Sequence, residues 1–232
     1  LKLADLPWFV DGRYVRKEGY PFNTIYLREF AGVDPETGSA LYYDNRQDEN
    51  GGYTKNTVTD PGKANPIPLK DITPTISGGF MNTFNYKFID LSFNLSYSFG
   101  GYSYDNASYI LQDDGYSVIS NKSTEQRRRW QKPGDITDVP RFVYGNKKGG
   151  NYNSSRAIHS TDHIRLKSLI LGVNAPKAWL QKLGIGNARV YFSGTNLLTW
   201  AAYDQYDPEM SGVVGFYTPP LKTYAFGLEL KF

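Results

Sequence analysis

The 232-residue sequence predicts an all-β fold, and more specifically part of an antiparallel β-barrel that crosses a membrane. Three observations lead to this prediction. Aromatic residues are abundant (19 Tyr, 13 Phe and 4 Trp) and, with 23 Gly, are typical of many strands separated by turns. Several segments alternate between apolar and polar residues, a pattern that only a strand can use. Short and long connections also alternate along the chain.

The composition excludes several classes of protein. Hydrophobic residues make up 40% of the chain and charged residues 21%, which excludes a disordered protein. The mean hydropathy of −0.51 and the absence of any apolar run near the roughly 20 residues of a spanning helix exclude a helical membrane protein. A net charge of +3 is too small to indicate a nucleic-acid partner. The sequence opens on Leu1 without a charged-then-apolar leader, which predicts a mature or internal piece of a longer protein.

The clearest strand is residues 88–99, where small polar residues separate apolar ones without exception. At about 3.3 Å per residue this segment is about 40 Å long, more than the 9–11 residues or so that a tilted strand needs to cross a bilayer. Its length therefore fits a barrel wall that extends beyond the membrane. The apolar residues are Ile89, Leu91, Phe93, Leu95, Tyr97 and Phe99.

Five further segments complete six predicted strands. Residues 224–232 repeat the strict alternation, and weaker alternation marks residues 22–31, 75–86, 162–175 and 188–199. Because a slip of one residue would exchange the two faces, the phase predicts which side chains meet lipid. We expect Phe93, Leu95, Leu228 and Leu230 to face outward, and Ser92, Asn94, Gly227 and Glu229 to face the lumen.

The connections predict the orientation of these strands. Residue Lys87 and a helical turn near 178–183 make the short connections, whereas residues 32–73, 100–161 and 200–221 make long ones. Short periplasmic turns and long extracellular loops are typical of an outer-membrane barrel. Six strands cannot close around a lumen, and an open sheet would expose an apolar face and two edges. We therefore expect the C-terminal part of a larger barrel.

Seven segments in a fixed order carry a resemblance to a known family. They are FAGVDPETG (30–38), PTISGGFMNTFNYKFIDL (74–91), RWQKPGD with DVPR (129–141), HIRLKSLILGVNAP (163–176), AWLQKLGIGNARVYFSGTN (178–196), YDPE (206–209) and KTYAFGLELKF (222–232). Through them the chain resembles the C-terminal barrel region of the SusC/RagA family of TonB-dependent outer-membrane transporters. The likeness covers about residues 20–232, and it departs at His163, where the family commonly has an aromatic residue.

The resemblance implies a part in energised import across the cell outer membrane. The complete transporter would be a plugged barrel of roughly 22 strands, with the plug, the earlier strands and the TonB-binding segment outside this sequence. It would work with a SusD-like lipoprotein as a lid and carry an oligosaccharide or a peptide. It would need no catalytic residue, metal or other cofactor. The last strand would also be the signal read by the outer-membrane assembly machinery, through Tyr224, Phe226, Leu228, Leu230 and Phe232.

The long loops hold the candidate contacts with substrate or lid, since loops on a rigid scaffold commonly carry binding residues. In the loop 100–161, an aromatic ring beside a guanidinium offers a stacking face and forked hydrogen-bond donors. The same residues could instead pack the loop against its neighbours. In the segment 200–217, aromatic residues could line the barrel mouth or belong to the aromatic girdle. The candidates are Tyr109, Arg129, Trp130, Arg141, Trp200, Tyr203 and Tyr206.

Two weaker motifs are better explained by structural roles than by metal binding or catalysis. Residues 44–51 resemble a calcium loop, but Arg46 occupies a ligand position and the glycine comes too late, which favours a polar hairpin tip. Ser160, Asp162 and His163 are the residue types of a hydrolase triad. As neighbours on one extended segment they point in alternate directions, and the sequence has no G-x-S-x-G elbow.

Two other classes of protein remain as alternatives. A soluble carbohydrate-binding β-sandwich would share the alternation and the aromatic loops, but it needs a second sheet over the apolar face. A passive porin-like barrel would share the membrane-spanning strands but would have no plug.

The alternating segment that ends on Phe232 generates a first prediction. Deleting Phe232 from the full-length protein, or replacing it with Asp, should impair insertion into the outer membrane and leave synthesis unchanged. Quantitative blotting of outer-membrane and whole-cell fractions measures both. A normal outer-membrane level of the truncated protein would refute the role of this residue in assembly.

Overall fold

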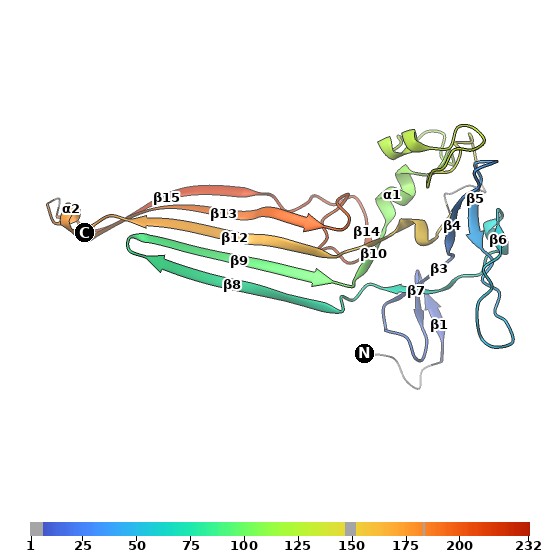
Figure 1. Ribbon diagram of the computed structural model, residues 1–232, viewed down its shortest axis with the longest axis horizontal. Coiled ribbons are helices and arrows are strands. Elements are labelled where there is room, and N and C mark those ends of the chain that lie inside the picture. Colours follow the sequence, from blue (N-terminus) through green and yellow to red (C-terminus); the bar gives the residue numbers. More distant parts are fainter. Residues whose placement is uncertain (1–6, 147–151, 183) are drawn as a thin grey trace. The chain divides into compact units, whose positions relative to one another are not determined.

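The computed structural model describes residues 7–146, 152–182 and 184–232, and its chain separates into two compact units (Figure 1). The strand unit consists of Pro74–Gly101, Ser160–Met210 and Tyr217–Phe232. The loop unit consists of Leu1–Thr73, Tyr102–His159 and Ser211–Phe216. In the described residues, no helix has the length and apolar character to cross a membrane.

The strand unit is one antiparallel sheet of five long strands. Its spatial order is β15-β13-β12-β9-β8, and every neighbouring pair is antiparallel. These strands confirm five of the six predicted ones to within about two residues at most ends, and the helical turn α2 (Lys177–Gln181) lies between β12 and β13 as expected. The bounds are β8 (Ile76–Tyr86), β9 (Ile89–Phe99), β12 (His163–Asn174), β13 (Asn187–Ala201) and β15 (Thr223–Lys231).

The prediction of a sixth long strand at residues 22–31 is wrong. The segment forms two short strands, β3 (Thr24–Leu27) and β4 (Phe30–Val33), which belong to different sheets of the loop unit. The backbone changes partners between them, because the Arg28 carbonyl accepts from the Ser155 amide and the Glu29 carbonyl accepts from the Tyr43 amide. Thr24, Ile25 and Leu27 are all buried, so this segment lacks the one wet face of a barrel strand.

The loop unit is built from small sheets and short helices rather than from irregular loops alone. One sheet has the order β1-β2-β3-β7, a second β4-β5-β6 and a third β11-β10-β14, whose β10–β14 pair is parallel. Helix α1 begins at Asn106, where the Asp105 side chain accepts from the Ser108 amide. The remaining bounds are β1 (Phe9–Asp11), β2 (Tyr14–Arg16), β5 (Ala40–Tyr43), β6 (Thr57–Val58), β7 (Ile67–Asp71), β10 (Tyr102–Asp105), α1 (Asn106–Leu111), β11 (Ile158–Ser160), β14 (Gly212–Val214) and 3-10 turns at Pro61–Lys63, Thr124–Arg128 and Ser155–Ala157.

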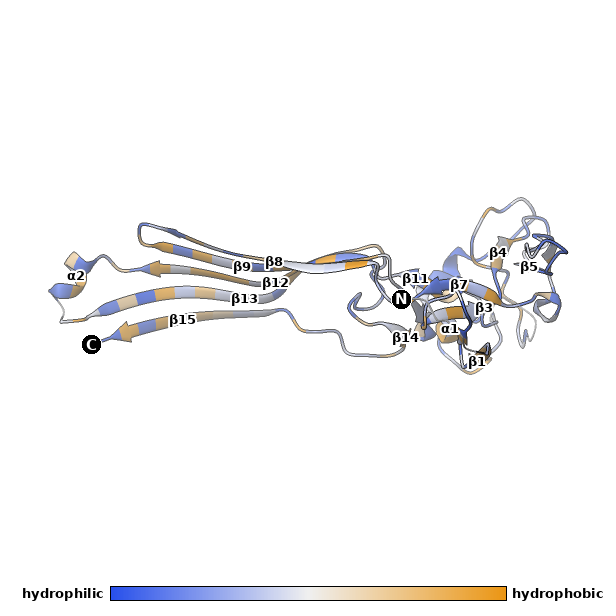
Figure 2. Ribbon diagram, turned by 90° about the horizontal axis from the view of Figure 1, so that it is seen from below, coloured by the Kyte–Doolittle hydropathy of each residue, from blue (hydrophilic) through white to orange (hydrophobic). Residues whose placement is uncertain are grey.

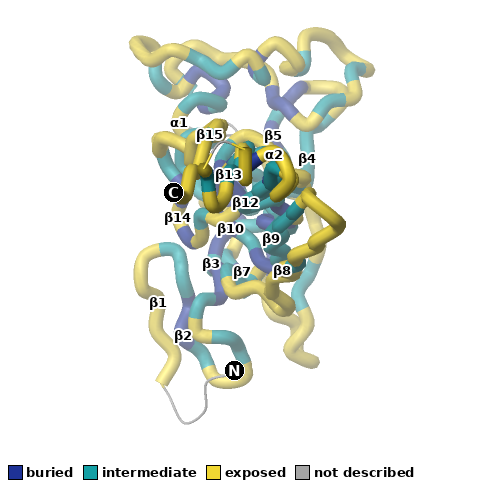
Figure 3. Tube along the Cα trace, turned by 90° about the vertical axis from the view of Figure 1, so that its left-hand side faces the viewer, coloured by how far each residue is buried: buried dark blue, intermediate teal, exposed yellow. Residues whose placement is uncertain are grey.

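Two clusters of buried apolar residues in the described part of the chain belong to the loop unit. One is centred on Tyr104 and Ile25, and the other on Tyr42. Burial raises the pKa of the Tyr42 and Tyr104 hydroxyls above their ordinary value, because a buried phenolate would lose its hydration. The long strands, by contrast, are half-buried or exposed along most of their length. Figure 3, which looks along the strands from one end, draws them mainly in the colours of exposed and half-buried residues.

The two faces of the long sheet differ in chemistry, and Figure 2 shows the alternating bands along its strands. Residues paired across strands share a face, so one transverse row on the apolar face is Phe84, Leu91, Leu171, Phe192 and Phe226. The side chains of this face are exposed or half-buried, and the exposed fraction reaches 81% for Phe226 and 62% for Leu228. The register confirms that Phe93, Leu95, Leu228 and Leu230 share this face, and that Ser92, Asn94, Gly227 and Glu229 share the other. Which face meets lipid stays a prediction.

An ion-pair network crosses four strands on the polar face. Arg189 on β13 bonds Asp90 on β9 at 2.6 Å and Glu229 on β15 at 3.3 Å. Asn174 on β12 also donates to Asp90 at 3.0 Å. A Cβ at Gly172 would lie 2.4 Å from the Asp90 carboxylate and 2.6 Å from Arg189 Nε, so glycine at this position makes room for the pair.

Candidate functional site

Trp130 is anchored on the turn that joins β4 to β5. Its indole Nε1 donates to the Pro35 carbonyl at 2.8 Å, and its ring lies against Gly38. A Cβ at Gly38 would be 2.4 Å from two ring carbons, and the φ of +68° at this residue is also one that glycine favours. One side of the Trp130 ring therefore packs within the loop unit, which is the structural role that the sequence left open.

A polar cavity of about 300 Å³ lies beside this anchor. The Arg141 amide donates to the Gly38 carbonyl at 2.8 Å, and this bond joins the segment that carries Arg141 to the same turn. The Arg141 side chain is exposed, and Asp60 supplies a carboxylate to the same cavity. The Asp60 carboxylate also accepts from the Gly62 amide at 2.9 Å. A guanidinium and a carboxylate that line one cavity suit a ligand that carries both charges. The lining residues are Gly38, Ser39, Ala40, Thr59, Asp60, Pro140, Arg141, Val143 and Asn146.

A buried ion pair holds one wall of the cavity in place. Arg156 binds both carboxylate oxygens of the fully buried Asp114, and Gln126 donates to Asp114 at 2.9 Å. Burial raises the pKa of the Asp114 carboxyl, and the positive charge of Arg156 opposes that change. The Asp114 carbonyl accepts from the Val143 amide at 3.1 Å, so this buried pair positions a residue that lines the cavity.

The structure does not gather all seven predicted contact residues into one site. Trp130 and Arg141 come together around Gly38, whereas the exposed Arg129 bonds the Gln126 carbonyl at 3.3 Å. Tyr109 lies on α1, with its ring 6.2 Å from that of the buried Tyr104. These four belong to the loop unit.

The other three candidates belong to the strand unit. Trp200 pairs with Ile164 on the apolar face of the sheet and is 57% exposed, which favours a place in the aromatic girdle. Tyr203 and Tyr206 follow β13, and their rings pack 5.1 Å apart. Contact of any of the seven with substrate or lid stays a prediction.

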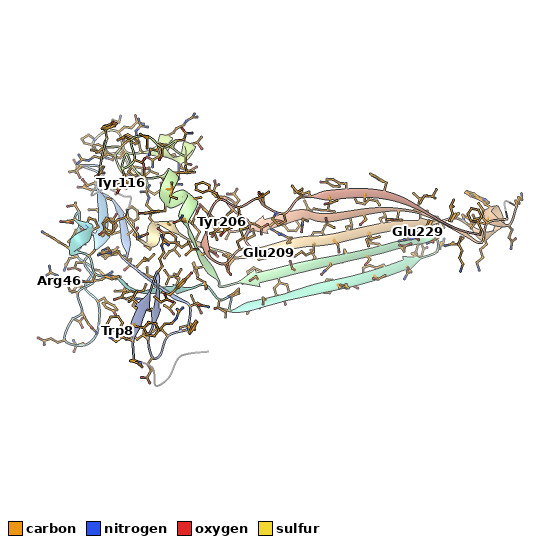
Figure 4. All side chains as sticks on the ribbon, turned by 180° about the vertical axis from the view of Figure 1, so that it is seen from behind. Trp8, Arg46, Tyr116, Tyr206, Glu209 and Glu229 are labelled. Atoms are coloured by element: carbon orange, nitrogen blue, oxygen red, sulfur yellow. The ribbon has the colours of Figure 1, made fainter. Side chains whose placement is uncertain are left out.

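A buried charged cluster of the strand unit was not predicted from the sequence. Arg165 on β12 bonds Asp207 and Glu209 at 2.8 Å each, and the side chains of Arg165 and Asp207 are 4% and 5% exposed. Lys167 bonds Glu209 at 2.5 Å, and His163 Nε2 lies 3.8 Å from the same carboxylate. Figure 4 shows Tyr206 and Glu209 near one end of the sheet and Glu229 near the other. The cluster thus ties the segment after β13 to the polar face of β12.

One signal in the sequence could have pointed to this cluster. His163, Arg165 and Lys167 alternate along one strand, and the segment YDPE supplies the acidic partners 42 and 44 residues after Arg165. The register shifts between Leu166 and Ser168, and such a bulge re-aims side chains.

The two weaker motifs have the structural roles that the sequence favoured. Asp48 accepts from the amides of Asn50 and Gly52, which confirms a polar hairpin tip. Ser160, Asp162 and His163 do not form a triad, because Asp162 accepts from the Gly100 amide and His163 Nδ1 contacts the Thr161 carbonyl. Among the described residues, no group of three or more His, Asp or Glu side chains could hold a metal ion.

Comparisons with known proteins place the chain near one class of receptor. No family model matches. A TonB-dependent receptor of Formosa agariphila is 29% identical over 94% of this chain and 23% of its own length, and a second one from the same organism is 32% identical over 77% and 17%. A structure of the RagAB peptide transporter matches with a TM-score of 0.79 at 29% identity, over 97% of this chain and 24% of that chain. The RagAB peptide importer in its closed-closed state matches with a TM-score of 0.81 at 29% identity, over 99% and 25%. The chain therefore spans about a quarter or less of the relatives that it matches.

The buried Arg165 cluster generates a second prediction. Arg165→Met in the full-length protein should release the segment 202–210, because it leaves Asp207 as a buried charge without its main partner. Removing one partner of a buried ion pair costs about 3–5 kcal/mol. Faster proteolysis within residues 202–210 should report the release. Arg46→Met is the matched control, since Arg46 is 71% exposed in its pair with Asp44. Equal cleavage rates in both variants would contradict the anchoring role of Arg165.

Proposed function

The chain is similar to one TonB-dependent receptor along 94% of its length and to a second along 77%. From this premise we propose that it forms part of the barrel wall of an outer-membrane TonB-dependent importer. The observation that carries the proposal is the long antiparallel sheet with one exposed apolar face and one polar face. Its strands of 9–15 residues are long enough to cross a bilayer.

The rest of the same polypeptide would supply what the sheet needs. Strands β8 and β15 are the edges of the sheet, and in an isolated protein such edges would pair with other chains. In our proposal they pair with the remaining strands of a plugged barrel of roughly 22 strands. This chain is then its C-terminal part, and TonB acts through the N-terminal part.

The order of the strand ends supports long connections on the outer side of the membrane. The register puts the start of β8, the end of β9, the start of β12 and the end of β13 at one end of the sheet, and β15 begins toward the same end. Every long connection therefore leaves from that end, as in barrels with long extracellular loops. A SusD-like lipoprotein would close over these loops as a lid.

We propose a peptide rather than a neutral oligosaccharide as the imported substrate. Arg141 and Asp60 line one cavity and can meet the carboxylate and the ammonium of a peptide, whereas one side of the Trp130 ring is already packed on Gly38. The two RagAB structures are those of a peptide transporter and importer, which agrees with this choice.

The two alternatives have less support. A soluble β-sandwich would cover the apolar rows of the strand unit, but these rows are exposed and the unit contains a single sheet among its described residues. A passive barrel would not depend on TonB, and this difference makes the two functions separable by experiment.

The proposal predicts energised uptake that depends on Arg141. Cells that express the full-length transporter should accumulate labelled peptides, and loss of TonB should abolish the accumulation. Arg141→Ala should reduce uptake about tenfold at matched outer-membrane abundance, since a charge-assisted hydrogen bond contributes about 1.5–3 kcal/mol. Lys132→Ala, which removes another exposed cation of the loop unit, is the control. Uptake that persists without TonB would contradict active import, and uptake of oligosaccharides alone would contradict the peptide assignment.

A further inference from the structure

An open apolar groove of about 500 Å³ lies at the end of the sheet that carries the short connections. Trp179 on α2 forms one wall, and β12, β13 and the turn before β9 form the others. The groove is lined by Phe88, Val173, Asn174, Ala175, Pro176, Trp179, Ala188 and Val190. Trp179 is 69% exposed and Val190 57%, so the groove opens to the surroundings of the sheet.

The groove continues the apolar face of the sheet. Val173 pairs with Ile89 on one side and with Val190 on the other, and Val190 pairs with Leu228. This row lies two residues beyond the row of Leu91, Leu171, Phe192 and Phe226, and therefore on the same face. Whatever covers the apolar face of the sheet reaches the groove as well.

Three lysines lie in the same short segments as the residues that line the groove. Lys87, Lys177 and Lys182 are exposed, and the segments 85–88 and 174–188 contain neither aspartate nor glutamate. The acidic residues of the adjoining strand ends, Asp90 and Glu229, lie on the opposite face, where both bind Arg189. An apolar groove whose lining segments carry exposed lysines but no aspartate or glutamate matches the chemistry of an anionic amphiphile.

We propose that this groove and its lysines bind an anionic phospholipid of the inner leaflet of the outer membrane. The acyl chain lies against Val173, Val190 and Trp179, and the lysines bind the phosphate. The assignment rests on the proposed function, which puts the short connections on the periplasmic side. Tryptophan and lysine at the end of an apolar band are suited to the membrane interface, since an amphipathic ring and a long cationic side chain both reach the headgroups.

The experiment uses the full-length transporter in bilayers of equal parts phosphatidylethanolamine and phosphatidylglycerol. After detergent extraction, native mass spectrometry counts the lipids that remain bound. Wild-type protein should retain phosphatidylglycerol in preference to phosphatidylethanolamine. The triple variant Lys87→Gln, Lys177→Gln, Lys182→Gln should lose that preference by about fivefold or more, since each lysine near an anionic surface strengthens binding about fivefold. Trp179→Ala should lower the retention of both lipids.

Two controls separate this proposal from the proposed function. Lys132→Gln changes an exposed lysine of the loop unit and should leave lipid retention unchanged. Failure of the wild-type protein to insert into the outer membrane would contradict the proposed function. Normal insertion with equal phosphatidylglycerol retention by wild type and triple variant would overturn the lipid site alone. A dimer that Trp179→Ala dissociates would also overturn it, because a second copy would then cover the groove.

Discussion

The pairing of five long strands aligns their apolar residues in transverse rows, and the other features of the strand unit depend on this alignment. Because the side-chain period of a strand is two, a shift of one residue in any pair would mix apolar and polar side chains on both faces. The register instead keeps Phe84, Leu91, Leu171, Phe192 and Phe226 together. The resulting face is apolar apart from Asn82, which pairs with Phe93, and its side chains are exposed or half-buried. In water such a face would favour aggregation, and in a bilayer it is a requirement.

The polar face complements this arrangement with charges that are held in ion pairs. Arg189 joins β9, β13 and β15 near the short connections, and Arg165 joins β12 to the segment after β13 near the long ones. Both networks use arginine, whose fork of donors bridges two carboxylates at once. The sheet therefore has fixed charges at both ends of its polar face. In the proposed barrel this face borders the lumen, where polar side chains remain hydrated.

How well each part of the structure can be predicted depends on how far apart in the sequence the residues lie that determine it. The long strands were predictable because alternation is local, and the segment 88–99 is unambiguous by itself. The segment 22–31 was not, because its backbone changes partners at Arg28 through contacts with Ser155 and Tyr43, which are distant in sequence. Arg165 and Asp207 are 42 residues apart, and Trp130 packs on a turn 95 residues earlier in the chain. Contacts between residues so far apart produce no periodic pattern in the sequence. The sequence therefore indicated which residue types the loops carry but not which residues they contact.

The most direct test of the account measures which face of the sheet meets lipid. Single cysteines on β9 and β15 of the full-length transporter, spin-labelled in bilayers, report their exposure to oxygen, which concentrates in the membrane, and to a water-soluble nickel chelate. The account predicts an alternation of period two, with oxygen exposure at Phe93, Leu95, Leu228 and Leu230, and nickel exposure at Ser92, Asn94, Gly227 and Glu229. The opposite phase, or equal exposure at all eight positions, would contradict a sheet that separates lipid from lumen.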